Sequence, residues 1–371
     1  MGKTKGIYFP GLNGIRAFAA LVVVFVHTSN RLDMFGLKSL WSEDSARFAV
    51  TVFFALSGFL ITYLLLVEKE KSGTIDIKKF YYRRILRIWP LYYTYILISV
   101  IVADFNVDWP ILFYLLIIPN LRSLFQSIVP TVLQNSVLQR MIGHYWSLGV
   151  EEQFYAFWPF IVKKVKKLFV VLLAIPIVFL FLKVALRILH APEGLVTVFN
   201  YTRFGCMAIG ALGAYFYYYK KNQISFLFNR GLEVLVYLFF CFVFTNNFHI
   251  TSIVDHEILA IFTILLIYQQ IGNPKVIISL EHKLLDFLGK ISFGIYVYHP
   301  LIIYVLSLLL SKIVFANAAL HMAVIFISVL FCTILISYIS YEYFEKRFLK
   351  LKHKYTTVES VATKADYNGK N

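Results

Sequence analysis

Apolar runs of membrane-spanning length recur along almost the whole chain, and they constrain the fold more than any other feature. Of the 371 residues, 59% are hydrophobic and only 15% are charged, whereas about a quarter of the residues in a soluble domain are charged. An apolar run of about 20 residues can cross a bilayer as a helix. The sequence therefore excludes a soluble globule and predicts an all-α, polytopic integral membrane protein. It lacks the weakly alternating segments of a transmembrane β-barrel.

The basic loops decide how many of the apolar runs cross the membrane. Candidate spans lie at about residues 11–30, 47–67, 88–105, 109–124, 147–162, 168–188, 203–219, 231–247, 256–271, 291–312 and 320–341. The Lys- and Arg-rich loops at 68–87 and 163–167 should both be cytoplasmic. Three crossings between these loops would put them on opposite sides, so we interpret the Pro-interrupted run 109–124 as a partly buried or re-entrant segment on the outer side. About ten spans then remain, with both termini in the cytoplasm.

The net charge of +16 does not point to a nucleic-acid partner, because the basic residues cluster in short loops beside apolar runs. Neither a disulfide framework nor a metal site is expected, since the three cysteines lie in apolar runs without CxxC spacing. We expect one transmembrane domain over residues 1–350. A disordered cytoplasmic tail should follow over residues 351–371, because the apolar period is lost from about Thr356.

Two ionisable residues stand in the first span. Arg16 and His27 are eleven residues apart, which brings them within about 20° of one helix face and roughly 16 Å apart along its axis. A lone histidine on an apolar helix often only packs against its neighbours. Unpaired ionisable groups are costly in hydrocarbon, however, so both residues are candidates for function.

Carboxylates also open the span at 147–162. Glu151 shares a helix face with Tyr155, four residues on. The alternative is a simple helix start, with Ser147 as the N-cap and the acids favoured by the helix dipole.

Two further groups of polar residues interrupt apolar segments. Arg84 and Arg87 lie three residues apart at the entry to a span, where they either anchor the cytoplasmic side or bind phosphate through their planar guanidinium groups. Tyr296 and His299 precede Pro300 in the segment KISFGIYVYHP, which could equally be a kink packed against neighbouring helices.

Taken together and in order over residues 11–350, these segments resemble the acyltransferase-3 family of bacterial integral membrane acyltransferases. LNGIRAFAALVVVFVH carries the family's Arg-x10-His spacing at Arg16 and His27, and FFALSGFLIT follows it. FYYRRILRIWPLYY carries the Arg-x-x-Arg pair at Arg84 and Arg87. HYWSLGVEEQFYAFWP contains the Trp-Ser-Leu-x-Val-Glu signature that ends at Glu151, and LGKISFGIYVYHPLI resembles a late family segment.

The resemblance implies ten membrane helices in the bacterial cytoplasmic (inner) membrane. It also implies transfer of an acyl group, most often acetyl from acetyl-CoA, to a hydroxyl of an extracytoplasmic or lipid-linked carbohydrate such as O-antigen or exopolysaccharide. Succinyl or longer acyl donors stay open. Two positions depart from the family, which usually has Asp where Asn13 stands and often has Asp where Thr51 stands. Many members carry a C-terminal esterase-like domain, which we do not expect in this sequence.

On this resemblance we expect His27 to be the general base toward the acceptor hydroxyl, with Glu151 orienting it. Arg84 and Arg87 are expected to hold the phosphates of acyl-CoA, and Arg16 lies on the path of the donor. The weaker candidates Tyr155, Tyr296 and His299 are expected to line the acceptor path, with no metal involved.

Two other classes of protein stay open. One is a proton-coupled glycolipid transporter or flippase that uses His27 and Glu151 as an intramembrane relay. No inverted repeat of broken helices supports it. The other is a membrane sensor without enzymatic activity.

Overall fold

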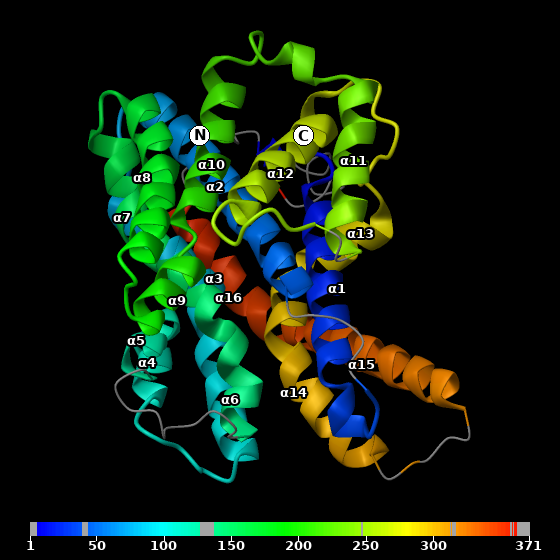
Figure 1. Cartoon of the computed structure of the whole chain (residues 1–371). Coiled ribbons are helices and arrows are strands. Elements are labelled where there is room, and N and C mark those ends of the chain that lie inside the picture. The colour runs from blue at the N-terminus through cyan, green and yellow to red at the C-terminus, as the bar shows by residue number, and fades with distance from the viewer. Residues whose placement is uncertain are drawn as a thin grey trace.

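The computed structural model describes residues 6–38, 44–126, 137–245, 248–311, 313, 317–356, 358 and 360–361. Long helices form most of the molecule (Figure 1). They are α1 (Leu12–Asn30), α2 (Asp44–Ser72), α3 (Ile77–Val102), α4 (Ile111–Leu115), α5 (Arg122–Gln126), α6 (Val137–Ile142), α7 (Trp146–Lys164), α8 (Leu168–Ile188), α9 (Glu193–Tyr201), α10 (Phe204–Tyr219), α11 (Arg230–Phe244), α12 (Asp255–Gly272), α13 (Lys283–Lys290), α14 (Ser292–Leu310), α15 (Ala318–Ser340) and α16 (Lys346–Lys352).

The all-α membrane class is confirmed, and a helix occupies each of the ten predicted spans. Among the described residues, seven helical segments are long and apolar enough to cross a membrane. Those seven do not include α7, α11 or α12. The first carries Glu151 and Glu152, the second has only 15 residues, and the third begins with Asp255 and Glu257. The number of crossings therefore stays a prediction, as do the sides on which the termini lie.

The run at 109–124 does not form a membrane-length helix, in agreement with its interpretation as something other than a span. It breaks into α4, the 3-10 helix η2 (Pro119–Leu121) and α5. The break follows from Ile117, which has a φ of 58°, and from Pro119, which cannot continue the α4 ladder. η2 packs against α7, where a Cβ on Gly149 would lie 2.6 Å from the Pro119 ring. This segment is thus partly buried.

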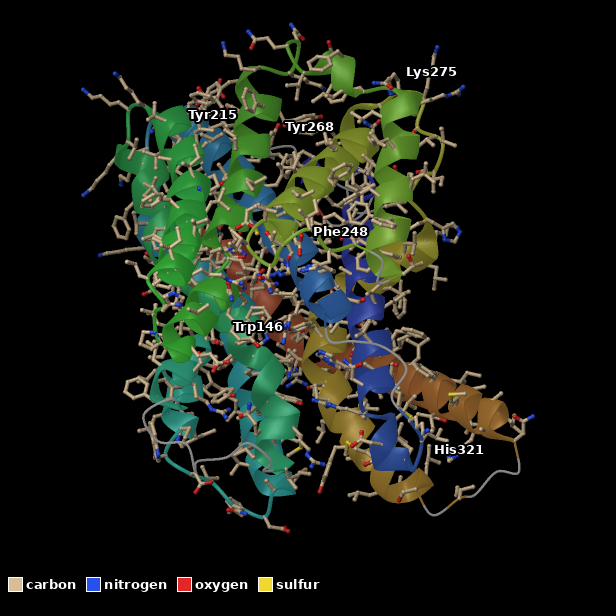
Figure 2. All side chains as sticks on the ribbon, viewed as in Figure 1. Trp146, Tyr215, Phe248, Tyr268, Lys275 and His321 are labelled. Carbon is tan, nitrogen blue, oxygen red and sulfur yellow. The ribbon has the colours of Figure 1, made fainter. Side chains whose placement is uncertain are left out.

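The loops predicted to be cytoplasmic meet at one end of the molecule. Lys69 in the last turn of α2 donates to the carbonyl of Val162 in α7 at 2.7 Å, and Lys163 donates to the carbonyl of Ile75 at 2.8 Å. Tyr215, Tyr268 and Lys275 lie toward this end, whereas His321 lies at the opposite end (Figure 2).

The described part of the C-terminal segment is folded further than we predicted. α16 runs through the expected boundary at residue 350, because α3 supplies partners for the residues that follow. The Tyr355 ring stacks on Tyr82 at 4.8 Å, and Arg83 donates to the Tyr355 carbonyl at 2.8 Å. The strand β2 (Ser360–Val361) pairs in parallel with β1 (Ile7–Tyr8). The rest of the predicted disordered tail, from residue 362, lies outside the described residues.

Glycines bring α2 and α10 into close contact at the centre of the fold. A Cβ on Gly58 would lie 2.0 Å from the Met207 carbonyl oxygen, and one on Gly210 would lie 2.1 Å from that of Ala55. Small residues let helix backbones approach this closely in membrane proteins. This contact fixes Ser57 on one side of α2 and the start of α10 on the other.

Candidate active site

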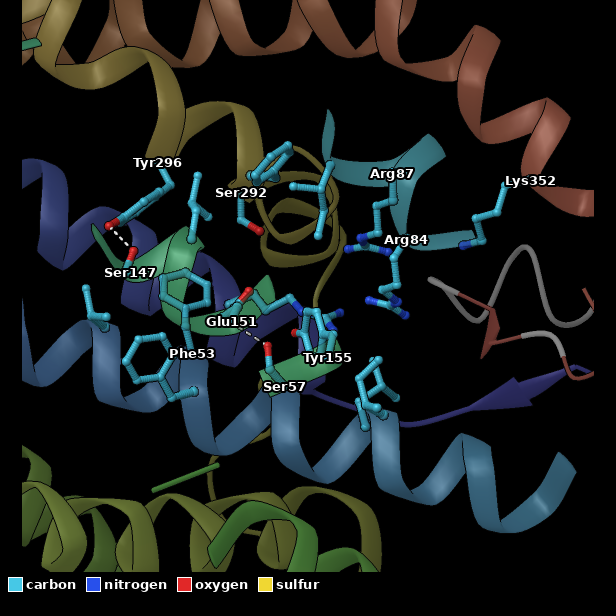
Figure 3. A pocket seen from close by; sticks show the side chains of 18 residues that line it. Phe53, Ser57, Arg84, Arg87, Ser147, Glu151, Tyr155, Ser292, Tyr296 and Lys352 are labelled. Atoms are coloured by element: carbon cyan, nitrogen blue, oxygen red, sulfur yellow. Dashed lines mark hydrogen bonds between the residues drawn. The ribbon is translucent and has the colours of Figure 1, made fainter. Parts of the chain in front are cut away.

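A cavity of about 940 Å³ lies between α1, α2, α3, α7 and α14 and reaches α16. Its wall is mainly apolar, with polar groups gathered on one side of α2 (Figure 3). The polar residues that line it are Arg16, Ser57, Arg84, Arg87, Ser147, Glu151, Tyr155, Ser292, Tyr296 and Lys352. Six of the eight residues singled out in the sequence are therefore brought together here. His27 and His299 are not in this wall.

The lining residues of the cavity carry four positive charges and one carboxylate. The guanidinium group of Arg84 lies over the ring of Tyr155 at 5.4 Å, and its buried Nε has no hydrogen-bond partner among the described residues. Arg87 lies one turn further along α3. Lys352, which the sequence placed in a tail, comes from α16. This excess of positive charge in one cavity favours an anionic ligand.

Glu151 faces this cavity rather than His27. Its Oε1 accepts a hydrogen bond from the Ser57 hydroxyl at 2.8 Å. We predicted that Glu151 orients His27, and the geometry does not support that pairing, because the two side chains have different partners. The physical reason is that Glu151 lies on the face of α7 that looks toward α2 and α3.

Ser147 does not cap α7. Together with Tyr296 it forms one end of the cavity, which we call the cavity floor (Figure 3). The position before α7 is Tyr145, with no side-chain cap bond. The Tyr296 hydroxyl lies 2.8 Å from the His144 carbonyl, and the Ser147 and Tyr296 hydroxyl oxygens lie 2.6 Å apart. The Ser147 hydroxyl also lies 3.3 Å from the His144 carbonyl, so either hydroxyl can be the donor in the Ser147–Tyr296 bond. Figure 3 shows this pair at one end of the cavity and Arg84, Arg87 and Lys352 at the other.

Three histidines lie directly behind that floor. His27 Nδ1 is 2.7 Å from His299 Nε2. The rings of His299 and His144 have centroids 5.2 Å apart, and the ring of His144 is equally close to that of Tyr296. Aromatic contacts therefore connect the cavity floor to His27 through a chain of rings.

The hydrogen bonds determine the tautomers of His299 and His27. His299 Nδ1 lies 3.3 Å from the Ile295 carbonyl, which can only accept, so in the neutral ring Nδ1 carries the proton. His299 Nε2 is then an acceptor for the Nδ1 proton of His27. This arrangement leaves a lone pair on His27 Nε2, the state that a general base requires. His299 thus makes the contact that we expected from Glu151.

His144 was not singled out in the sequence. It is buried at 6% exposure, and neither ring nitrogen has a hydrogen-bond partner among the described residues. Its place two residues before Trp146, at the head of a polar stretch, was the only available signal. No sequence signal pointed to a role for Lys352, because it is one of several basic residues in the C-terminal segment.

Asn13 and Thr51 stand where the resemblance predicted Asp, and they have different surroundings. Asn13 donates to Asp286 of α13 at 3.3 Å, and its amide oxygen is 3.5 Å from Arg16 Nη1. An acid therefore lies close to this site, supplied from α13. Thr51 instead contacts His256 and Arg203, on the far side of α2 from the cavity.

A profile described as an acyltransferase domain matches residues 9–342. The chain is 26% identical over 335 residues to the O-acetyltransferase OatA of Staphylococcus aureus, covering 81% of this chain and 51% of that protein. It is 30% identical over 159 residues to the peptidoglycan O-acetyltransferase OatA of Listeria monocytogenes, covering 41% of this chain and 24% of that protein. The chain thus spans about half the length, or less, of these curated relatives. No solved structure matches.

Proposed function

This chain belongs to the acyltransferase family whose domain it matches over residues 9–342, and we propose that it is a membrane O-acyltransferase. The donor is a cytoplasmic acyl-CoA, most simply acetyl-CoA. The acceptor is a hydroxyl of an extracytoplasmic or lipid-linked carbohydrate. The names of the relatives support acetyl as the group and a carbohydrate such as peptidoglycan as the acceptor.

One observation carries the proposal for the donor. Three guanidinium groups and one ammonium group line a single cavity, and Glu151 is the one carboxylate in its described lining. Coenzyme A carries a diphosphate and a 3′-phosphate, and guanidinium forks bind phosphate bidentately whereas a lysine acts as a point charge. Arg84, Arg87 and Lys352 lie at the same end of the cavity (Figure 3), where the phosphates would bind. The thioester would then point toward Tyr296 and Ser147.

The proposed acyl transfer uses the histidines that lie behind the cavity floor. His27 Nε2 removes the proton from the acceptor hydroxyl, the hydroxyl oxygen forms a bond to the thioester carbon, and the carbon–sulfur bond breaks. The proton on the imidazolium goes to the leaving thiolate of CoA. We call the cavity that holds Arg84, Arg87 and Lys352 the donor cavity. The Ser147–Tyr296 hydrogen bond separates it from the histidines, so the acyl group has to pass this pair. His299 holds the tautomer of His27 that acts as the base.

A proton-coupled transporter is the second candidate, because three adjacent histidines could relay protons. The basic cavity opens at the end predicted to be cytoplasmic, where it suits a soluble donor that carries several phosphates, and this favours the acyltransferase. Binding of the donor separates the two.

The test is calorimetric titration of acetyl-CoA into the purified protein. The Arg84→Gln, Arg87→Gln double variant should lose at least about tenfold in affinity, because each charged hydrogen bond contributes roughly 1.5–3 kcal/mol. The matched control is Lys78→Gln, Lys79→Gln, which removes two exposed positive charges from the same helix one to two turns earlier. Equal losses in both variants, or no binding by folded wild type, would overturn the donor assignment.

A further inference from the structure

A second cavity, of about 1120 Å³, lies on the other side of α2. It is formed by the starts of α2, α10 and α12 and the end of α9, which by the predicted topology are the ends of these helices that face away from the basic loops. Trp146 and Phe248 lie between the two ends of the molecule in Figure 2, so this region is at intermediate depth. The lining residues are Arg47, Phe48, Thr197, Asn200, Tyr201, Arg203, Phe248, His249, Ser252, Asp255 and His256.

Arg203 is a buried cation in this cavity, with 3% exposure. It donates to the carbonyls of Asn200 at 3.2 Å and Arg47 at 2.9 Å, and to the Thr51 hydroxyl at 3.1 Å. All of these partners are neutral. Within the described residues no carboxylate lies at ion-pair distance from Arg203, and its Nη2 makes no hydrogen bond. A buried charge without a counter-ion is costly unless a ligand supplies one.

The acidic group of the cavity does not compensate for Arg203. Asp255 accepts hydrogen bonds from the backbone amides of Ile250 and Thr251 at 2.9 and 3.1 Å, and pairs with His249 at 2.8 Å. The nearby Lys183 and Glu257 form their own buried pair at 2.6 Å. Arg47 adds a second guanidinium group, 5.9 Å over the ring of Tyr201. The carboxylate that lines the cavity therefore does not balance the charge of Arg203.

The cavity also has the mixed lining of a small-molecule site. Tyr201, Phe48 and Phe248 supply flat apolar surfaces, and Asn200 and Ser252 supply hydrogen-bonding groups. The side chain of Trp146 contacts both this cavity wall and the wall of the donor cavity. The Trp146 ring lies 4.6 Å from that of Tyr201 in this wall and 6.1 Å from that of Phe54 in the donor wall.

We propose that this second cavity binds the acceptor carbohydrate through an anionic group, a carboxylate or a phosphate, held by Arg203 and Arg47. The inference rests on the proposed function, because it takes the ligand to be the carbohydrate acceptor. The ligand replaces the missing counter-ion of Arg203, and the aromatic rings bind the apolar face of the sugar. His27, His299 and His144 do not line this cavity. The hydroxyl to be acylated therefore has to extend from it past Trp146 to reach His27.

The experiment compares two sugars that differ by one carboxylate-bearing group. N-acetylmuramic acid and N-acetylglucosamine are titrated against the full chain in phosphatidylcholine nanodiscs, with acetyl-CoA titrated into the same samples. Wild type should bind N-acetylmuramic acid at least about tenfold more tightly, the ratio expected for a hydrogen bond to a charged group. Arg203→Gln and Arg47→Gln should each abolish the preference. Arg230→Gln, which removes an exposed charge near Lys275, should keep it.

Arg203→Gln removes bonds that tie α10 to α2 and can therefore disturb the fold. Arg47→Gln keeps these bonds of Arg203, because the Arg47 acceptor is its backbone carbonyl. Retained acetyl-CoA binding reports an intact protein. Equal affinity of wild type for the two sugars, or a preference that survives in folded Arg47→Gln, would overturn the proposal. So would loss of the preference in phosphatidylglycerol nanodiscs, because a lipid headgroup would then be the occupant. Sugar preference without acetyl-CoA binding would contradict only the proposed donor.

Discussion

His27 Nδ1 lies 2.7 Å from His299 Nε2, and the Ile295 carbonyl fixes which of these nitrogens carries the proton. The two hydrogen bonds therefore point the same way, from His27 in α1 to His299 and from His299 to a backbone carbonyl in α14. His27 Nε2 is left without a proton. A carboxylate usually orients a catalytic imidazole. In this protein a second imidazole does so, and the carboxylate that we expected in that role belongs to the donor cavity.

Replacing His27 by alanine should abolish acyl transfer, a loss of about 10²–10⁴-fold for a general base. Binding of acetyl-CoA should be unchanged, because His27 does not line the donor cavity. Acyl transfer from labelled acetyl-CoA and calorimetric donor binding check the two halves. Transfer at a near wild-type rate would remove His27 from the chemistry.

Replacing His299 tests a positioning role rather than a catalytic one. His299→Leu removes the acceptor for the His27 Nδ1 proton and should lower kcat at least about tenfold with the donor KM unchanged. His299→Gln should recover much of this loss, since an amide oxygen can accept the same proton. Equal activity of the two variants would mean that His299 only fills space.

The close contact of α2 and α10 should make Gly58 intolerant of any side chain. A Cβ there would lie 2.0 Å from the Met207 carbonyl oxygen, so Gly58→Ala should destabilise the protein by about 1–3 kcal/mol or more. Gly231→Ala is the control, because its nearest atom would be the Asn229 side-chain oxygen at 3.3 Å. The measurement is the thermal midpoint in detergent. A Gly58→Ala midpoint equal to that of the control would contradict this packing.

The turn before α3 should carry a pH-dependent helix cap. Asp76 accepts a hydrogen bond from the Lys79 backbone amide at 3.0 Å, and this bond lowers the pKa of Asp76. Its contribution is therefore present above the unfolded-state pKa and is lost as the pH falls through the folded-state value. Asp76→Ala should cost about 1 kcal/mol at neutral pH and Asp76→Asn much less. Identical midpoints for Asp76→Ala and wild type at pH 7 would show that the cap does not matter.

The sequence predicted the wall of the donor cavity better than it predicted the contacts of the base. Helical periodicity puts Glu151 and Tyr155 on one face, and the spacing of Arg84 and Arg87 puts both near one side of α3. Periodicity within one helix does not say how that helix is rotated against its neighbours. The partner of His27 was for this reason assigned to Glu151, while the structure supplies His299 from α14.

Lys352 is a second residue whose place in the cavity wall could not be predicted from the sequence. It lies beyond the last apolar run, in a stretch whose composition resembles a solvated tail. Only the packing of α16 and the residues after it against α3, through Tyr355 and Arg83, brings it to the cavity. Arg203 was also missed, because an arginine next to an apolar run reads as a membrane-edge anchor.

The most direct test is a cryo-electron microscopy structure of the protein in nanodiscs with a non-hydrolysable thioether analogue of acetyl-CoA. The account predicts phosphate density against Arg84, Arg87 and Lys352, and the acetyl group beside the Ser147–Tyr296 pair. Density for the analogue at any other site, or an empty cavity at saturating analogue, would contradict it.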